Sequence, residues 1–322
     1  MASVRRTLTH RDYDVGWICA LSLERVAAKA MLDECHTELQ CPGDNNIYVL
    51  GRVAKHNVVI TCLPEYGTTS VAWVASKMLT SFPSIRIGLM VGIGGGIPSK
   101  SNDIRLGDVV VSTPTENQPG VVQYDLGKTG ESGSFHRKGT LNKPPVLLRN
   151  AAIAIQGKRN VEQEISKHIS GSFREWPERV PEPRCLGEDR DVLYEAKYNH
   201  EKDNPTCDGC DKLQVISRPP RTNNHPVIHF GNIASGNQVM KDGVTRDRLA
   251  KQENVICFDM EAAGLMDEFP YLVIRGISDY SDSHKNGDWQ PYAAAAAAAY
   301  AKEILLVVPP QTVENMAPIQ GL

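Results

Sequence analysis

Short apolar runs alternate with segments of helical spacing along most of the chain. The runs are rich in Val, Ile and Leu, as in strands that are covered on both faces of a sheet. Runs that predict strands lie at 14–20, 46–53, 57–63, 85–92, 108–112, 227–234, 255–258 and 271–277. Segments that predict helices lie at 22–33, 68–79, 146–156, 262–268 and 292–308. This alternation favours an α/β fold with one sheet between two layers of helices.

Residues 157–226 interrupt the alternation. The stretch is rich in charged residues, Pro and Asn, and its apolar runs are short and isolated. Because so little apolar surface cannot form a core of its own, we expect a long insertion here rather than a second domain. The last predicted helix contains seven consecutive alanines at 293–299, which favour helix, and two prolines at 309 and 310 end it. We therefore expect a single domain over 1–322 with a short C-terminal tail from about residue 309.

Composition excludes several broad classes of protein. The 322 residues are 41% hydrophobic and 23% charged, which is ordinary for a globular protein. Lys and Arg number 35 and Asp and Glu number 38, so the formal net charge of −3 argues against a general nucleic-acid binder. No apolar run approaches the roughly 20 residues that cross a bilayer, and the N-terminus lacks the apolar stretch of a secretory signal. The eight cysteines have no disulfide-framework spacing. We expect a soluble, cytoplasmic protein with neither a nucleic-acid nor a membrane partner.

Three predicted strands are followed by acidic residues. Glu24 follows the first strand, Glu261 follows the strand at 255–258, and Asp279 follows the strand at 271–277. Ligands of such folds bind beyond the carboxyl ends of strands, where partial burial raises the pKa of a carboxyl group. Each acid alone is better explained as a residue favoured at a helix N-terminus. Three acids from separate strand ends favour one shared site instead.

A glycine run follows the strand at 85–92. The sequence GIGGGIP lacks the dinucleotide-binding pattern GxGxxG, which needs a glycine where Ile97 stands and a helix directly afterwards. We predict a turn at this point. Two interpretations remain open, a tight turn without a ligand and a turn whose backbone approaches a planar or phosphate-bearing ligand closely.

Four sequence motifs occur along the chain in this order: VGIGGGIPSKSNDIRLGDVVVS, IASGNQVMKDG, CFDMEAAGLM and VIRGISDYSD. Together they resemble the purine/uridine phosphorylase superfamily, and most closely its methylthioadenosine/S-adenosylhomocysteine nucleosidase branch. The resemblance covers about 14–156 and 227–308. The insertion and the alanine-rich ending look like fungal nucleoside-phosphorylase-like domains at the N-terminus of larger receptor-like proteins. The resemblance implies a three-layer phosphorylase/hydrolase-like fold with a central mixed twisted sheet, no cofactor, and a homo-oligomer, with a dimer favoured.

The resemblance also implies roles for individual residues. Asp279 matches the acid that protonates or hydrogen-bonds N7 of the purine, so that the base leaves more easily. Glu24 matches the glutamate that activates the attacking water. Glu261 matches the carboxylate that binds the ribose hydroxyls, and Met260 packs under the sugar. The remaining residues matched to substrate-binding positions are Ile93, Gly94, Gly95, Gln238, Val239, Met240, Phe258 and Arg275.

Departures from the family pattern favour water over phosphate as the nucleophile. Phosphorylases of this kind carry a GDPxR motif after the first strand, whereas this chain has ALSLERV, which includes Glu24. They also place a serine in the glycine turn, where this chain has Ile93. Phosphate needs several charge-assisted donors, and two of the usual ones are missing. We therefore predict a hydrolase, although Arg25 and Arg275 keep a phosphate-dependent purine nucleoside phosphorylase as an alternative.

The expected substrate is a plain purine nucleoside. Val239 stands where an aromatic residue often stacks on the base, so a specificity for methylthio- or homocysteinyl-ribosides does not carry over. We expect adenosine, with guanosine or inosine as further candidates. An alternative from a different class is a non-catalytic nucleoside- or nucleotide-sensing domain of a larger receptor-like protein. The complete set of Glu24, Glu261 and Asp279 argues against a domain that only binds.

The insertion contains one further motif. His200 precedes the sequence CDGC, whose cysteines are Cys207 and Cys210. These residues offer three zinc ligands, whereas structural zinc takes four, and Cys185 is a candidate to complete the set in space. We prefer an ordinary exposed turn without a metal and keep a zinc or disulfide staple as the alternative.

Overall fold

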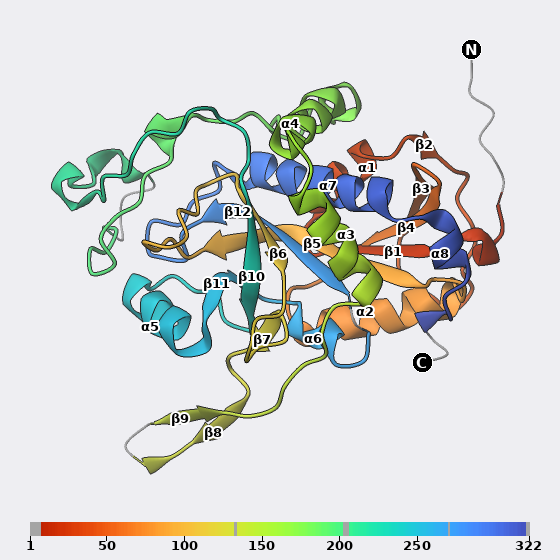
Figure 1. Ribbon diagram of the computed structural model, residues 1–322, viewed down its shortest axis with the longest axis horizontal. Coiled ribbons are helices and arrows are strands. Elements are labelled where there is room, and N and C mark those ends of the chain that lie inside the picture. The colour runs from red at the N-terminus through yellow and green to blue at the C-terminus, as the bar shows by residue number, and fades with distance from the viewer. Residues whose placement is uncertain (1–7, 132–133, 202–205, 270, 320–322) are drawn as a thin grey trace.

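Figure 1 shows the computed structural model of the chain, which describes residues 8–131, 134–201, 206–269 and 271–319. The strands are β1 (Val15–Cys19), β2 (Glu34–Cys35), β3 (Val49–Val53), β4 (His56–Cys62), β5 (Ile87–Gly96), β6 (Val109–Ser112), β7 (Val121–Gln123), β8 (Gly127–Thr129), β9 (Phe135–Arg137), β10 (Ile228–Ser235), β11 (Val255–Asp259) and β12 (Leu272–Asp279). The α-helices are α1 (Ser22–Ala30), α2 (Thr68–Ser81), α3 (Val146–Gln156), α4 (Val161–Ser172), α5 (Gly243–Glu253), α6 (Ala263–Met266), α7 (Gln290–Val307) and α8 (Pro310–Glu314). Within these ranges, no helix combines the length and the apolar character needed to span a membrane.

Among the described residues, ten strands form one mixed sheet. Its order is β11-β10-β6-β12-β5-β1-β4-β3-β2, with β7 paired to β10. β1 runs parallel to β4 and β5, whereas β6 runs antiparallel to β12. β12 is buried along its whole length, as its apolar sequence predicts for a strand covered on both faces. The predicted α/β fold with a central mixed sheet is therefore confirmed.

Part of this sheet closes into a ring. The last residues of β5 pair antiparallel with β11, with Gly96 opposite Cys257 and Gly95 opposite Phe258. Because β5 also pairs with β12, the strands β11, β10, β6, β12 and β5 follow one another around a closed circuit. The closure brings the carboxyl ends of β5, β11 and β12 together beside the end of β1.

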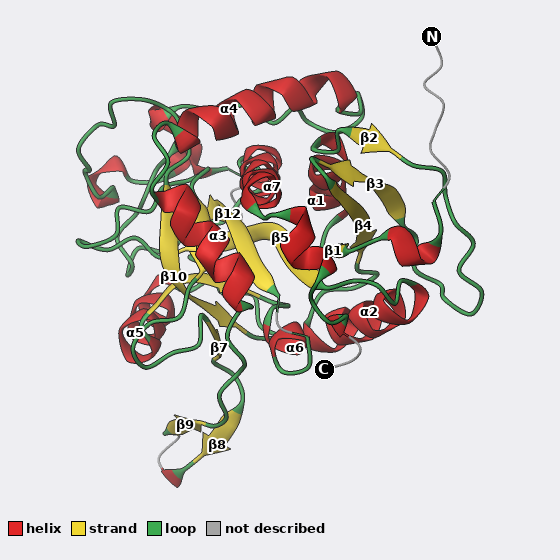
Figure 2. Cartoon of the chain, turned by 45° about the vertical axis from the view of Figure 1, so that its right-hand side comes forward, coloured by secondary structure: helices red, strands yellow, loops and turns green. Residues whose placement is uncertain are grey.

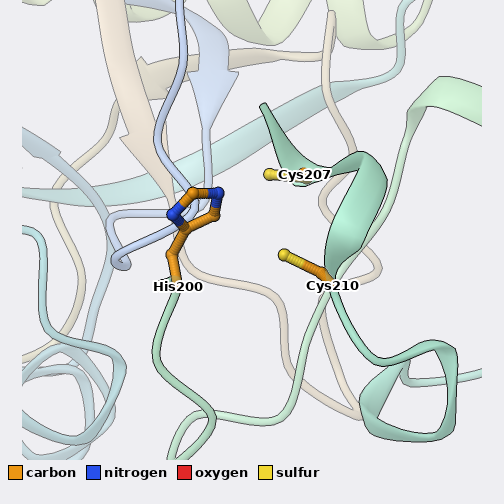
Figure 3. Close-up of side chains that lie close together, drawn as sticks. All are labelled: His200, Cys207 and Cys210. Carbon is orange, nitrogen blue, oxygen red and sulfur yellow. The ribbon is translucent and has the colours of Figure 1, made fainter. Parts of the chain in front are cut away.

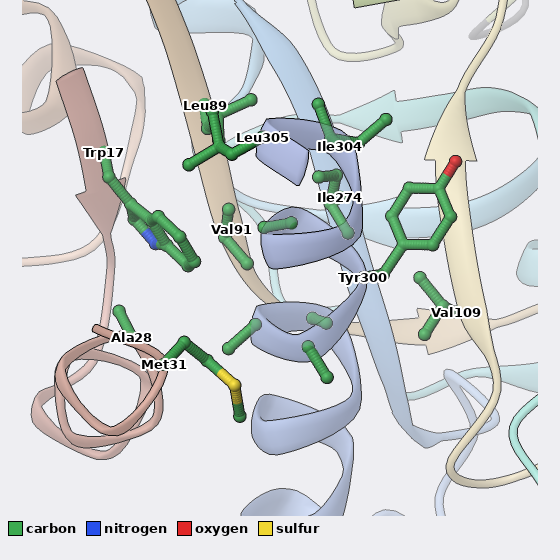
Figure 4. Close-up of a cluster of buried hydrophobic side chains, with 14 of the residues drawn as sticks. Trp17, Ala28, Met31, Leu89, Val91, Val109, Ile274, Tyr300, Ile304 and Leu305 are labelled. Carbon is green, nitrogen blue, oxygen red and sulfur yellow. The ribbon is translucent and has the colours of Figure 1, made fainter. Parts of the chain in front are cut away.

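Two apolar layers hold the sheet between helices. In Figures 1 and 2, α1, α3, α4 and α7 lie over one face of the sheet, and α2 and α6 lie over the other. Successive residues of a strand face opposite layers, so Trp17 packs in the layer with α7 and Ile18 in the layer with α2. Figure 4 shows Trp17, Leu89 and Ile274 around α7. The alanine run of α7 is buried throughout, and its small side chains let the sheet and three helices approach closely.

The glycine run is a strand and not the predicted turn. β5 continues through Gly96, and its glycines pair with β12 and β11 instead of leaving the sheet. Glycine usually weakens a strand, because it has no side chain to pack. Here neighbouring side chains occupy the space that side chains on the glycines would need, so this strand depends on the absence of Cβ atoms.

The C-terminal end also differs from the prediction. The prolines end α7, but the chain beyond them turns back onto the core instead of forming a tail. α8 buries Val313, and the backbone N–H of Ile319 donates to the carbonyl of Ile85 at 2.9 Å. The helix predicted at 262–268 is shorter and spans only the four residues of α6.

Within 157–226, the described residues form α4 and several short 3-10 turns joined by irregular chain. α4 packs on α7 through Ile165 and Ile169, which are buried in the same apolar layer. The imidazole of His168 lies 2.9 Å from the carboxylate of Glu303 on α7. The contacts of α4 thus hold the beginning of this segment against the helical layer.

Candidate active site

Two of the three predicted acids, Glu24 and Glu261, line one cavity of about 300 Å³ at the closed part of the sheet. Asp279 lines an adjoining cavity of about 560 Å³, and Ser278 lines both. The other predicted residues on the wall of the smaller cavity are Ile93, Gly94, Gly95, Gln238, Val239, Met240, Phe258 and Met260. Arg275 is fully buried behind the acids and is not on that wall. The structure thus gathers the predicted residues around one place.

Glu24 is held in place by backbone donors. α1 starts directly after β1, which puts Glu24 in the first helical turn, 3% exposed. One carboxylate oxygen accepts from the backbone N–H groups of Ala20 (2.7 Å) and Leu21 (3.0 Å), and the other accepts from that of Ile93 (2.8 Å). Burial raises the pKa of Glu24, while Arg275 and these N–H donors act against the rise. The result is a fixed, desolvated carboxyl group at the cavity wall.

Arg275 links the acids beneath the cavity. Its guanidinium donates to Oδ2 of Asp259 through Nη2 (2.6 Å) and Nε (3.0 Å), and Nη2 lies 3.4 Å from Oε2 of Glu261. A Cβ on Gly92 would lie 2.5 Å from Oε1 of Glu24 and 2.6 Å from Nη1 of Arg275, so only glycine fits there. Burial raises the pKa of Glu261 to about 7; Arg275 opposes this shift, and the charges of Asp259 and Glu24 add to it.

Asp279 is surrounded by donors at the end of β12. Its Oδ2 accepts from the Ser278 hydroxyl (2.9 Å) and from the Lys285 ammonium (2.8 Å), and its Oδ1 accepts from the backbone N–H of Ser281 (2.9 Å). Ser281 adopts a left-handed backbone conformation, with φ of 55°. A Cβ on Gly95 would lie 1.9 Å from the Ser281 hydroxyl oxygen, which again only glycine avoids.

The remaining cavity wall is apolar on one side and cationic on another. Phe258 is buried and meets the ring of Tyr124 edge to face, with 5.5 Å between ring centroids. Met260 lies next to Glu261 on the same wall, and Lys241 and Lys285 also line the cavity. Val239, predicted to read the purine, is half exposed at the rim. Such a wall suits a flat apolar ring system with polar groups at one end.

Sequence reasoning missed Asp259 and Lys285. Asp259 lies within the quoted motif CFDMEAAGLM, between residues to which roles were given, and only the fold shows its ion pair with Arg275. Lys285 follows Asp279 by six positions, in a polar segment without periodicity, and reaches it because the chain turns back after Ser281. For Lys285, the sequence offered one signal, namely a lysine only six residues after the predicted acid Asp279.

The three candidate metal ligands also come together. One ligand atom each from His200, Cys207 and Cys210 lies within 4.8 Å of the others. Cys185, proposed to complete the set, lies beside Tyr292 instead. In the described part of the chain the cysteines are free, so the predicted alternative of a disulfide staple is absent there.

Comparisons with known proteins find relatives of two lengths. A nucleotide-binding leucine-rich repeat (NLR)-like protein of Hyaloscypha variabilis is 47% identical over 316 residues, which cover 97% of this chain and 31% of that protein. The ATP nucleosidase Cap17 of Escherichia coli is 32% identical over 299 residues, 89% of this chain and 50% of Cap17. This chain therefore spans no more than half the length of these two relatives.

Shorter relatives match over almost their whole length. The 5'-methylthioadenosine/S-adenosylhomocysteine nucleosidase of Mycobacterium bovis is 28% identical over 301 residues, 92% of this chain and 96% of that enzyme. The crystal structure of the corresponding nucleosidase from Helicobacter pylori superposes with a TM-score of 0.58 at 14% identity, covering 91% of this chain and 98% of that one. That likeness shows the same fold. Residues 14–306 match the family model described as Phosphorylase superfamily, and with the shared fold this confirms the predicted kinship: the chain belongs to the phosphorylase superfamily.

Proposed function

We propose that this domain is a purine nucleosidase, which hydrolyses the N-glycosidic bond of a purine nucleoside to the free base and ribose. The observation that carries the proposal is the convergence of Glu24, Glu261 and Asp279, from three separate strand ends, on two adjoining cavities. Membership of the superfamily and the relatives named as nucleosidases support it.

Each acid has a distinct task in this reaction. Breaking the bond leaves positive charge on the ribose and negative charge on the base, so Asp279 in its protonated form assists departure of the base by giving its proton to N7 and becoming a carboxylate. General acid–base catalysis of this kind contributes about 10²–10⁴-fold. Glu261 binds the ribose hydroxyls; with a pKa of about 7 it both accepts and donates hydrogen bonds near neutral pH. Glu24 takes the proton of the attacking water.

The contacts of Glu24 support water, and not phosphate, as the nucleophile. An oxyanion such as phosphate needs backbone N–H groups and cations as donors. The N–H groups of Ala20, Leu21 and Ile93 already donate to Glu24. The guanidinium of Arg275 is paired with Asp259 and Glu261 through Nε and Nη2, which leaves only its buried Nη1 without a hydrogen-bond partner among the described residues. A phosphate ion here would also meet the negative charge of these carboxyl groups. A water molecule needs only the acceptor that Glu24 provides.

The cavity wall suits a purine and leaves room for substituents on the ribose. Phe258 and Met260 offer apolar surface for the base and the sugar. Lys241 on the same wall would attract a phosphorylated 5' end, whereas Lys285 is paired with Asp279. Because of Lys241, and because one relative is an ATP nucleosidase, we include nucleoside 5'-phosphates among the candidate substrates.

Product analysis tests the proposal. The chain is incubated with adenosine, guanosine, inosine, uridine and ATP, with and without phosphate, and the products are separated by chromatography. We expect free purine in phosphate-free buffer, at a rate that falls at least about 10²-fold in Asp279→Asn. Glu303→Gln is the matched control, because Glu303 is a buried acid on α7 away from the cavity. Product only with phosphate would indicate a phosphorylase, and binding without product would indicate a sensing domain.

A further inference from the structure

A second group of reactive side chains lies in the insertion, outside the cavity that Glu24 lines. His200, Cys207 and Cys210 place one ligand atom each within 4.8 Å of the others. Figure 3 shows both thiol groups and the imidazole on the border of a common space. Tetrahedral zinc has Zn–S bonds of about 2.3 Å and Zn–N bonds of about 2.0–2.1 Å, so its ligand atoms lie roughly 3.5–3.8 Å apart. A contraction of about 1 Å therefore gives the geometry of a zinc site.

The local chain is built to hold this arrangement. A 3-10 turn at Cys207–Gly209 brings the two cysteines of the CDGC sequence to one side, at the C-x₂-C spacing common in zinc sites. The backbone N–H of Asp211 donates to the Tyr198 hydroxyl at 2.8 Å, and an isolated bridge pairs Tyr194 with Val215. These contacts hold together the described segments that carry His200 and the two cysteines.

His284 is an independent indication that a ligand belongs here. Its side chain is 6% exposed, and within the described residues neither ring nitrogen makes a hydrogen bond. Oδ1 of Asp282 lies 3.5 Å from Nδ1, too far for a good bond. The centroids of the His284 and His200 rings are 5.5 Å apart. Two imidazoles bound to one tetrahedral ion have centroids roughly 5 Å apart. His284 lies beside the three atoms that are within 4.8 Å of one another but outside that group, so its ring must shift toward them to serve as a fourth ligand.

The contact of His200 with the backbone is compatible with metal binding. Its Nε2 donates to the carbonyl oxygen of Thr206 at 3.0 Å. Metal-binding imidazoles commonly donate their second ring N–H to such a carbonyl. Binding through Nδ1 keeps this contact, and binding through Nε2 replaces it.

We propose that His200, Cys207 and Cys210 bind a divalent zinc-class cation, with His284 as the fourth ligand. The cavity of about 560 Å³ that Cys207, Cys210 and His284 line provides an entry path for the ion. The His284 ring stacks on Tyr194, and within the described residues its nitrogens have no hydrogen-bond partner. A bound cation would give one of these nitrogens a partner. Bound in this way, it joins two parts of the chain that are far apart in sequence.

The site would fix the insertion to the segment that follows Asp279. The backbone N–H of His200 already donates to the Ser283 hydroxyl at 2.9 Å, and Sγ of Cys207 lies 3.8 Å from the carbonyl oxygen of His284. The next residue, Lys285, contacts Asp279. A cation here thus stabilises the segment that positions Lys285. The existence of the metal site does not depend on the proposed reaction.

Metal analysis of the whole chain tests the proposal. The protein is purified under reducing conditions, stripped with a chelator, reconstituted with zinc and analysed by elemental mass spectrometry. We expect about one zinc per chain, with affinity reduced tenfold or more in Cys207→Ser and Cys210→Ser. Cys185→Ser and Cys35→Ser are matched controls, because both cysteines are exposed and lie outside the cluster. Reconstituted protein without zinc, or Cys207→Ser with undiminished affinity, would overturn the proposal.

Cobalt substitution identifies the ligands without relying on activity. Co²⁺ bound to two thiolates in a tetrahedral site gives an intense near-ultraviolet charge-transfer band and strong visible bands. We expect both in the wild-type chain, loss of the charge-transfer intensity in Cys210→Ser, and shifted visible bands in His284→Gln. Visible bands typical of octahedral cobalt would contradict the site, and an unchanged spectrum in His284→Gln would remove that residue from it.

Discussion

The ammonium group of Lys285 lies 2.8 Å from Oδ2 of Asp279, the carboxylate to which we assign the proton transfer. The Ser278 hydroxyl donates to the same oxygen atom. These two donors, from residues on either side of the acid, determine which way its carboxyl group faces. Lys285 is therefore a positioning residue in this account, and its effect should appear in the rate of the chemical step.

Replacing Lys285 tests this relationship. A charge-assisted hydrogen bond contributes about 1.5–3 kcal/mol, which corresponds to roughly 10–100-fold in rate. We expect Lys285→Met to lower kcat by about this factor with a smaller change in KM, and Lys285→Arg to restore part of it. Steady-state kinetics of free purine release measure both constants. An unchanged kcat, or an Arg variant no better than Met, would argue against positioning by this cation.

Glu24 should be required for turnover but not for binding. Its carboxylate accepts from three backbone N–H groups, and glutamine retains one oxygen to accept part of these hydrogen bonds. We expect Glu24→Gln to reduce hydrolysis by about 10²–10⁴-fold, because the general base is lost. Calorimetric titration should show purine nucleoside binding that is within a few-fold of wild type. If this variant retained hydrolysis, a group other than Glu24 would have to be the general base.

Glu261 should make folding stability depend on pH in a defined direction. Its pKa is raised to about 7 in the folded protein, from 4.5 for an unperturbed glutamate. Between these values the folded chain holds a proton that the unfolded chain has released. Protonation of Glu261 therefore stabilises the folded protein. This contribution to the free energy of unfolding is complete below about pH 4.5 and is lost as the pH rises to about 7.

Glu261→Gln removes that titration. We expect the unfolding free energy of the variant, relative to wild type, to rise by about 1–3 kcal/mol between about pH 5 and pH 8. Urea unfolding at several pH values measures the difference. Glu303→Gln is the control and should stay nearly parallel to wild type over this range: hydrogen bonding to His168 lowers the pKa of Glu303, so the contribution of that group is lost only as the pH falls below about 4.5. Parallel stability curves for Glu261→Gln and wild type would contradict the expectation.

Gly95 should be intolerant of even one methyl group. A Cβ there would lie 1.9 Å from the Ser281 hydroxyl and 2.8 Å from Oδ1 of Asp279, so the acid must shift. A displacement of about 1 Å typically costs 10²-fold in rate, and we expect at least that loss in Gly95→Ala. Gly171→Ala is the control, since nothing lies within 4 Å of its Cβ position on α4. That variant should keep full activity and gain about 0.4–1 kcal/mol in thermal or urea unfolding.

Much of the fold could be predicted from sequence because strong apolar periodicity marks buried strands and helices. The strand ends that carry Glu24, Glu261 and Asp279 were located in this way, since each acid follows a long apolar run. α5 was missed because its surface is mostly polar; its start depends on Asp242, whose side chain accepts from the backbone N–H of Thr245 at 2.7 Å. Such local signals are weak without the apolar pattern.

Other features depend on distant parts of the chain and leave no local signal. The glycine run was predicted as a turn because glycines usually end strands, whereas here they admit Glu24, Arg275 and Ser281 from other elements. The pairing of Arg275 with Asp259 likewise exists only after β11 and β12 have come together. Tertiary proximity, and not propensity, determines these positions.

The measurement that tests the central claim most directly follows the oxygen atom that the reaction adds to ribose. A purine nucleoside that the chain cleaves, with adenosine as the first choice, is incubated in phosphate buffer made with oxygen-18 water, and the sugar product is analysed at early times by mass spectrometry. If water activated by Glu24 is the nucleophile, the products are free purine and ribose that carries one oxygen-18 atom, and no ribose 1-phosphate forms. Formation of ribose 1-phosphate, with labelled ribose absent, would show that phosphate is the nucleophile and would contradict the account.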